Sequence, residues 1–492
     1  MSTASEAAPA PPRAAPARGS ELLSGVDNAW LRMDEPANLM QINGVLVLEE
    51  RVEVEAIKAI VRQRLLPIPR FRQLVVAGEG ERPRWQDDPG FDLDRHVLEE
   101  RLADPGDDEA LAALIGRLMS TPLDPGRPLW EFRLIQSYRS GCVLFGCIHH
   151  VIGDGVALML VLLALTDLAP RGSATVRPRP DVPNDAQPGE PGEPAHNPFT
   201  DLFAHPARDL AKIRALAHEI MPEAMRLLLD PAEAFRRARL LTGVAGVGAF
   251  GRLVGRWPDP RTAFKGPLVV PKLVAWSERL PLAEVKEVGR VLGGTVNDVL
   301  VAAVSGGLRR YLARQAEPPP GLNIRVAMPV NLRPLGRMAE LGNHFGLIFL
   351  SLPLGIADPL ARLAEVRRRA GALKRSTEPL VVYGILRALG RVPLAVQRLV
   401  VKIFATKATA VMTNVPGPRQ TLYLAGKAIG DIFFWVPQSG RVGLGVSICS
   451  YRGSVRLGVS TDAGLLPDPA AIVEGFHADF AELLSLARGR AA

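Results

Sequence analysis

Apolar residues along the chain follow two spacings, strict alternation and the three-to-four spacing of helices, and stretches of the two kinds interleave. In the first half, the predicted strands are residues 40–49, 71–76, a short one near Trp85, 128–136 and 142–149, and the predicted helices are 24–32, 53–64, 107–119 and 156–165. In the second half, the predicted strands are 270–280, 323–331, 347–352, 442–448 and 455–459, and the predicted helices are 282–292, 297–313, 358–373 and 469–486. This interleaving indicates a mixed α/β (α+β) fold.

The composition changes abruptly in the middle of the chain. Residues 170–198 are rich in Pro, Gly, Asp and Glu, which predicts a linker or a flexible surface loop. Residues 199–241 then resume helical spacing with many Arg and Lys. Because 492 residues exceed what one hydrophobic core usually supports, we expect two domains. The expected division is a disordered Ala/Pro-rich tail at 1–19, a first domain at 20–169, the linker with basic amphipathic helices at 170–256, and a second domain at 257–492.

The formal net charge of +8 favours anionic partners, which include nucleic acid, acidic lipid head groups and phosphate-bearing cofactors. No nucleic-acid-binding motif accompanies this charge, so we expect no nucleic-acid partner. The basic helices at 199–241 have two interpretations, either lying on a membrane surface or packing against a domain with a solvated basic face. The longest apolar helix candidate, residues 155–168, is shorter than the roughly 20 residues that cross a bilayer. Any membrane contact is therefore expected to be peripheral.

Three cysteines, Cys142, Cys147 and Cys449, lie in apolar stretches that resemble strands. This setting predicts reduced, buried thiols of a cytoplasmic protein and no disulfide framework. None of the three lies in the polar setting that activates a thiolate, and the chain has neither a GxSxG elbow nor a GxxxxGK phosphate loop. The GxGxxG match at residues 246–251 follows a basic helical stretch instead of a strand, which disfavours dinucleotide binding.

The strongest local signal is the stretch from Cys147 to Gly155, which reads Cys-Ile-His-His-Val-Ile-Gly-Asp-Gly. The surrounding apolar runs predict a strand, a turn and a helix, with Asp154 at the N-cap of the helix. Alternation along the strand points His149 and His150 to opposite faces. One imidazole can then face a cleft as a general base, while shared metal ligation by the pair is disfavoured.

A second polar signal, Thr295-Val296-Asn297-Asp298, precedes an amphipathic helix. Thr295 can cap this helix, which puts the Asn297 amide at the positive end of the helix dipole. Such an amide either stabilises a developing oxyanion or serves the cap alone. The polar, Gly-rich turns at 342–346 and 413–418 are candidates for cleft walls or for structural turns.

Taken together, these stretches resemble the bacterial wax ester synthase/diacylglycerol O-acyltransferase family from about residue 23 to residue 486. The stretches that carry the resemblance are HHxxxDG as His149 to Gly155, PLW as Pro128-Leu129-Trp130, ND as Asn297-Asp298, and the second-half motifs at 329–333, 342–346 and 414–418. The linker at 170–198 and the tail at 1–19 differ from the family pattern.

The resemblance implies two chloramphenicol-acetyltransferase-like domains with an active-site channel between them. It implies transfer of a long-chain acyl group from acyl-CoA, a co-substrate, to diacylglycerol or a fatty alcohol, without a metal or other cofactor. The implied catalytic residues are His150 as general base, His149, Asp154 as an orienting residue, and Asn297 as an oxyanion donor. The implied supporting residues are Gly155, which allows close packing at the helix start, Asp298, Pro128, Leu129 and Trp130. The implied channel residues are Asn331, Arg333, Asn343 and Asn414.

The basic surface would then contact the phosphates of CoA and the anionic inner face of a membrane or a lipid droplet. Two alternatives remain open from the sequence. One is a condensation-type acyltransferase that uses a carrier-protein thioester or another acceptor. The other is a non-enzymatic, basic protein that binds lipid surfaces.

Overall fold

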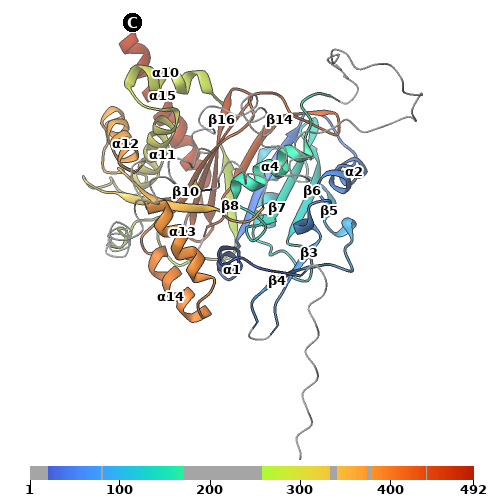
Figure 1. Cartoon of the computed structure of the whole chain (residues 1–492). Coiled ribbons are helices and arrows are strands. Elements are labelled where there is room, and N and C mark those ends of the chain that lie inside the picture. The colour runs from blue at the N-terminus through green and yellow to red at the C-terminus, as the bar shows by residue number, and fades with distance from the viewer. Residues whose placement is uncertain are drawn as a thin grey trace, which may run out of the picture.

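The computed structural model describes residues 20–78, 81–170, 257–332, 341–373, 378–438 and 440–491. Two large mixed sheets with flanking helices make up most of this part of the chain (Figure 1). The predictions for the tail at 1–19, for residues 171–256 with their basic helices and GxGxxG match, and for Arg333 lie outside the described residues.

The first sheet has six strands, and all neighbours are antiparallel except β5 and β6. In sheet order they are β13 (Tyr423–Leu424), β14 (Lys427–Trp435), β2 (Gln41–Leu48), β7 (Gly141–His149), β6 (Trp130–Tyr138) and β5 (Val97–Arg101). The helices of this half are α1 (Gly25–Leu31), α2 (Val54–Arg64), α3 (Asp108–Met119) and α4 (Gly155–Leu165), with 3-10 turns at Pro69–Phe71 and Leu93–Arg95. A small sheet of β1 (Glu21–Leu22), β4 (Arg84–Asp87) and β3 (Gln73–Val76) lies beside them.

The two faces of the first sheet are covered by different helices. Residues of α2 and α4 pack on the face that carries Leu46 and Leu144, whereas α3 packs on the face that carries Val45 and Phe145. The sequence of α4, Gly-Val-Ala-Leu-Met-Leu-Val-Leu-Leu-Ala-Leu, is apolar on every side. A helix of this kind is stable only where all its sides are covered.

The second sheet has seven strands, with parallel pairing of β12 to both β10 and β15. Its strands are β11 (Phe345–Leu352), β10 (Ile324–Asn331), β12 (Ala410–Pro416), β15 (Leu444–Tyr451), β16 (Ser454–Asp462) and β8 (Lys272–Trp276), with β9 (Leu280–Pro281) paired to β16. The helices of this half are α10 (Leu282–Leu292), α11 (Val296–Ala313), α12 (Pro359–Leu373), α13 (Glu378–Leu389), α14 (Leu394–Ala405) and α15 (Pro469–Ala491).

The helices of the second half also divide between two faces. Residues of α10, α11, α12 and α15 share one core with the second sheet, whereas α13 packs with α1 against the other face. In the described part of the chain, no single helix has the length and apolarity to cross a membrane, although α10 and α11, bent by 95° at their junction, meet that test as a pair.

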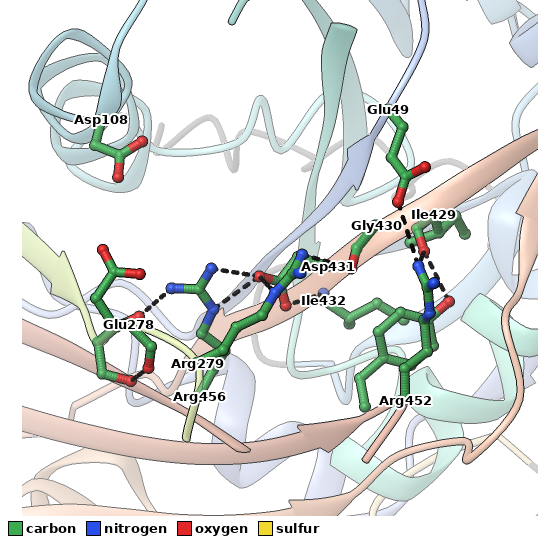
Figure 2. Close-up of polar contacts among 12 residues, drawn as sticks. Glu49, Asp108, Glu278, Arg279, Ile429, Gly430, Asp431, Ile432, Arg452 and Arg456 are labelled. Atoms are coloured by element: carbon green, nitrogen blue, oxygen red, sulfur yellow. Dashed lines mark hydrogen bonds and ion pairs between the residues drawn. The ribbon is translucent and has the colours of Figure 1, made fainter. Parts of the chain in front are cut away.

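Two strands from the second half of the chain, β13 and β14, belong to the first sheet. Strand β14 comes late in the chain but pairs antiparallel with β2, with Trp435 opposite Asn43. The second domain expected at 257–492 therefore does not keep all its strands in its own sheet. Figure 2 shows how β14 is held: Arg279 and Arg456, from the second half, both donate to the Asp431 carboxylate on β14, at 3.0 and 2.7 Å. Asp431 is only 4% exposed, so this pairing satisfies a charge that burial would otherwise penalise.

Most predicted elements are present with shifts of a few residues at their ends. Strands β1, β5, β12, β13 and β14 and helices α13 and α14 have no counterpart among the predicted elements. In β14, Gly430 and Asp431 interrupt the apolar alternation where the strand changes register against β2. Several large apolar side chains of α14 are exposed to solvent. In an amphipathic helix of a globular protein, such side chains usually face the core.

Candidate active site

His149 is the last residue of β7, and its side chain is hydrogen-bonded to the backbone of the turn that follows. Its Nδ1 accepts a hydrogen bond from the Val151 N–H at 3.0 Å, and its Nε2 lies 3.7 Å from Oδ2 of Asp34. The side chain is 3% exposed and does not line the cavity described below. Of the two histidines, His149 is therefore the one that packs inside the protein away from the cavity.

His150 lies on the cavity wall. Its ring stacks on Trp30 at a centroid distance of 4.4 Å and contacts Phe345 at 5.4 Å. Its backbone is held on both sides, because its N–H donates to the Met40 carbonyl at 2.7 Å and its carbonyl accepts from Nδ2 of Asn343 at 2.7 Å. The predicted separation of the two imidazoles is confirmed, since only His150 faces the cavity.

The electrostatic setting of His150 favours the neutral ring. Burial lowers the pKa of His150 from 6.5 to about 4, and the negative charge of Asp154 and the Asn343 side chain only partly oppose this effect. The ring is therefore neutral near pH 7, with one nitrogen able to accept a proton. Nδ1 of His150 is buried without a hydrogen-bond partner.

Asp154 links the catalytic turn to the second half of the chain. Its Oδ1 accepts from the Ala157 N–H at 3.0 Å, which confirms the predicted N-cap of α4. Its Oδ2 accepts from the His344 N–H at 2.9 Å, and Gly153 forms a backbone bridge with Gly342. One carboxylate thus fixes both the start of α4 and the position of the 342–344 segment beside His150.

Asn343 forms a second link, to Asp27, a partner that the sequence pattern did not predict. The Asn343 backbone N–H and side-chain amide donate to Oδ1 of Asp27, at 3.2 and 2.8 Å, while the amide also reaches the His150 carbonyl. Asp27 and Trp30 lie on α1, and Asp34 follows shortly after it. The available signal was a polar pair, Asp27-Asn28, inside an otherwise apolar helix.

Asn297 and Asp298 begin α11 as predicted. Oδ2 of Asp298 accepts from the Thr295 N–H at 2.8 Å, and Thr295 Oγ1 accepts from the Asp298 N–H at 3.2 Å, which completes a capping box. Oδ1 of Asn297 accepts from Nδ2 of Asn414 at 3.1 Å. Asn414 lines the cavity and Asn297 does not. The oxyanion role of Asn297 remains a prediction, and its contact with the cavity runs through Asn414.

The Pro128-Leu129-Trp130 stretch supports the strand that carries the histidines. The Leu129 carbonyl accepts from the His149 N–H at 2.9 Å. The Trp130 indole donates to the Phe71 carbonyl at 2.9 Å and stacks on His96 at 4.5 Å. None of these three residues lines the cavity.

The expected role of Gly155 in close packing is wrong. A Cβ added at Gly155 would have no heavy atom within 4 Å outside its own neighbourhood, and the residue lines the cavity. Close approach occurs instead at Gly153, where a Cβ would lie 3.0 Å from that of Ala157. Gly155 leaves space open beside the catalytic turn.

The cavity has a volume of about 270 Å³ and lies between the two halves. One wall comes from β2, β7 and α4 of the first half, together with β14, which joins the first sheet, and the other wall comes from β10, β11 and β12 of the second half. Gly44 and Gly146, which are directly paired on β2 and β7, form part of its floor. Its lining is mainly apolar, and the polar exceptions from the second half are Asn331, Thr413 and Asn414. Asn343 adjoins the wall through His150.

No group of His, Cys, Asp and Glu in the described ranges has the arrangement of a metal site. The three cysteines are buried, as predicted, and carry free thiols. Burial raises the pKa of Cys142 to about 11 and that of Cys449 to about 12, and it raises the pKa of Cys147 as well. Thiols in this state are poor nucleophiles.

Comparison with known proteins gives consistent results in sequence and fold. The model of the wax ester synthase/diacylglycerol acyltransferase catalytic domain matches residues 23–300, and the model of the WS/DGAT C-terminal domain matches residues 341–484. A putative diacylglycerol O-acyltransferase from Mycobacterium tuberculosis is 31% identical over 443 residues, which cover 87% of this chain and 88% of that protein. A probable diacylglycerol O-acyltransferase, tgs1, from the same organism is 26% identical, with 89% of each chain covered.

Solved structures share the fold. The wax ester synthase/diacylglycerol acyltransferase from Marinobacter aquaeolei VT8 superposes with a TM-score of 0.63 at 21% identity, covering 95% of this chain and 99% of that chain. The first condensation domain of the calcium-dependent antibiotic synthetase superposes with a TM-score of 0.57 at 13% identity, covering 97% and 98%. The expected acyltransferase fold is confirmed. The chain belongs to the wax ester synthase/diacylglycerol acyltransferase family and is an acyltransferase.

Proposed function

We propose that the protein transfers a long-chain acyl group from acyl-CoA to the hydroxyl of diacylglycerol or a fatty alcohol, with His150 as general base. The observation that carries this proposal is a neutral, buried imidazole on the wall of an apolar cavity between the two halves. The names of the family and of its Mycobacterium relatives support the choice of substrates.

The proposed step needs one proton acceptor and no covalent enzyme intermediate. Nε2 of His150 takes the proton of the acceptor hydroxyl, and the oxygen attacks the thioester carbonyl carbon. The C–S bond then breaks, and the CoA thiolate leaves with the proton from His150. A positioned base of this kind contributes about 10²–10⁴ in rate.

The cavity lining fits hydrocarbon substrates. Apolar side chains of α4 and of the facing strands continue from His150 along the cavity. The amides of Asn331 and Asn414 are neutral, polar groups on the opposite wall, suited to the thioester and hydroxyl end of the substrates. Asn297, bonded to Asn414, orients that amide in this proposal, and a donor to the oxyanion is worth about 10²–10³ in rate.

The proposal includes peripheral contact with an anionic membrane or lipid-droplet surface on the cytoplasmic side, where such acceptors reside. The net charge of +8 supports this contact, as it supports binding of CoA phosphates.

The direct test is turnover by the purified full chain. Palmitoyl-CoA with dispersed dioleoylglycerol or hexadecanol should yield free CoA together with triacylglycerol or wax ester, measured by thiol release and mass spectrometry. Absence of both products would refute the substrate assignment. Turnover only with a carrier-protein thioester would move the protein to condensation-type chemistry.

A further inference from the structure

Helix α14 exposes an unusual share of the large apolar side chains. Nine such side chains are exposed in the described part of the chain, and four of them lie on this one helix: Leu394, Val396, Leu399 and Ile403, with exposures of 39, 46, 58 and 42%. Val396, Leu399 and Ile403 are three and four residues apart, so they share one face. A cluster of this kind marks an interaction surface, whereas isolated exposed apolar residues do not.

The opposite face of α14 is firmly attached to the protein. Gln397 donates through Nε2 to the Ala29 carbonyl at 2.8 Å, and Val400 and Val401 pack against the core that contains Trp30. The turn that precedes α14 is also fixed to α1, since the Asn28 amide donates to the Gly390 carbonyl at 2.6 Å. The exposed face is therefore presented by a rigidly held helix, at the lower edge of the molecule in Figure 1.

The surroundings of this face are basic. No acidic residue occurs from residue 379 to residue 409, while Arg387, Arg391, Arg398 and Lys402 are all exposed. Apolar side chains bordered by cations match the surface of an anionic lipid layer, which offers hydrocarbon beneath negative head groups. The same positive charge disfavours a second copy of this face as the occupant.

An exposed tryptophan lies at the end of the same helix. The Asp259 N–H donates to the carbonyl of Thr406, the residue after α14, at 3.0 Å, and Trp257 stands two residues earlier in the chain. Trp257 is 85% exposed, whereas the other five tryptophans are buried or partly buried. Tryptophan is enriched at membrane–water interfaces because its ring is apolar with one polar N–H.

We propose that α14 docks this protein on an anionic lipid surface through Val396, Leu399 and Ile403, with Arg398 and Lys402 on the head groups and Trp257 at the interface. This inference rests on the proposed lipid contact and assigns it to a site. Because α14 is bonded to α1, and Trp30 of α1 stacks on His150, docking would hold the catalytic cavity close to the lipid that supplies the acceptor.

Vesicle binding tests the site without requiring turnover. The full chain is mixed with vesicles of phosphatidylglycerol and phosphatidylcholine, and the bound fraction is measured by sedimentation. Combined Val396→Ser, Leu399→Ser and Ile403→Ser substitutions should lower the partition coefficient by about tenfold or more. Arg398→Gln and Lys402→Gln should each lower it by about fivefold on anionic vesicles and leave binding to neutral vesicles unchanged. Leu168→Ser, at a remote site of 37% exposure, is the matched control and should bind like the wild type.

Trp257 gives an independent signal of the docked face. Its emission should shift to the blue on vesicle addition, and Trp257→Phe should abolish the shift. Circular dichroism checks that each variant keeps its helix content. Equal vesicle binding by the wild type and the α14 triple variant would overturn the proposal, as would a wild type that does not bind. A change of oligomeric state in the triple variant would assign the face to a second copy instead. Loss of binding with intact turnover of dispersed substrates would separate this inference from the proposed reaction.

Discussion

The two walls of the cavity differ in chemistry. The wall from the first half carries the proton acceptor, His150, and the apolar side chains of α4, whereas the wall from the second half carries the amides of Asn331 and Asn414. Neither wall holds both sets of groups. The proposed reaction therefore requires that the two walls be placed accurately relative to each other. Asp154 accepts a hydrogen bond from the His344 N–H, and the Asn343 amide donates to the His150 carbonyl, so these two residues join the walls.

The largest effect is expected from the first wall. Replacing His150 with Ala removes the proposed base and should lower kcat/KM by about 10²–10⁴. His149→Ala should have a smaller effect, because His149 supports the strand and lies outside the cavity. Steady-state CoA release measures both variants. Equal, mild losses would contradict the assignment of different roles to the two residues.

The next largest effect concerns the link between the walls. Asp154→Ala removes the N-cap of α4 and the acceptor for the His344 N–H, so both stability and kcat should fall. Asp107→Ala is a matched control, because Asp107 caps α3 with the same bond, to the Ala110 N–H at 2.9 Å, away from the cavity. Each cap should contribute about 0.5–2 kcal/mol to the free energy of unfolding. If both variants keep full activity, Asp154 has no role in joining the walls.

A smaller effect is expected from the second wall. Asn414→Ala and Asn297→Ala should each reduce kcat more than they change KM, because an amide that stabilises an oxyanion acts mainly in the transition state. The two residues share a hydrogen bond of 3.1 Å, so a double-mutant cycle should show coupling of about 0.5–3 kcal/mol. Additive losses would mean that Asn297 acts independently of Asn414.

The smallest effect concerns space between the walls. Gly155→Leu places a side chain in the open volume beside the catalytic turn, so it should raise KM for long-chain substrates while the melting temperature stays near that of the wild type. Gly153→Ala, where a Cβ meets Ala157, should instead lower the melting temperature. Thermal unfolding and KM measurements on the two variants show whether position 155 borders open cavity space and position 153 is closely packed. A large loss of stability in Gly155→Leu would contradict the cavity assignment.

The difference between the walls also explains what the sequence could predict. Residues close together in the sequence determine the strand, turn and helix around His150 and the capping box at Thr295. These features could therefore be predicted from apolar periodicity and from the capping residues. The pairing of β14 with β2 and the contacts of Trp30, Asp27 and Asn343 join residues that lie far apart in the sequence, and no local pattern encodes them. The error at Gly155 has the same origin, because open space is a property of the assembled walls.

The pH dependence of kcat/KM tests the central claim, a neutral buried base at His150, most directly. Burial lowers the pKa of His150 to about 4, so activity should rise with pH through that value and stay constant from about pH 5.5 to 7.5. Circular dichroism at each pH excludes loss of folded protein as the cause of the acid limb. An acid limb near the ordinary histidine pKa of about 6.5, with the fold intact, would contradict the account.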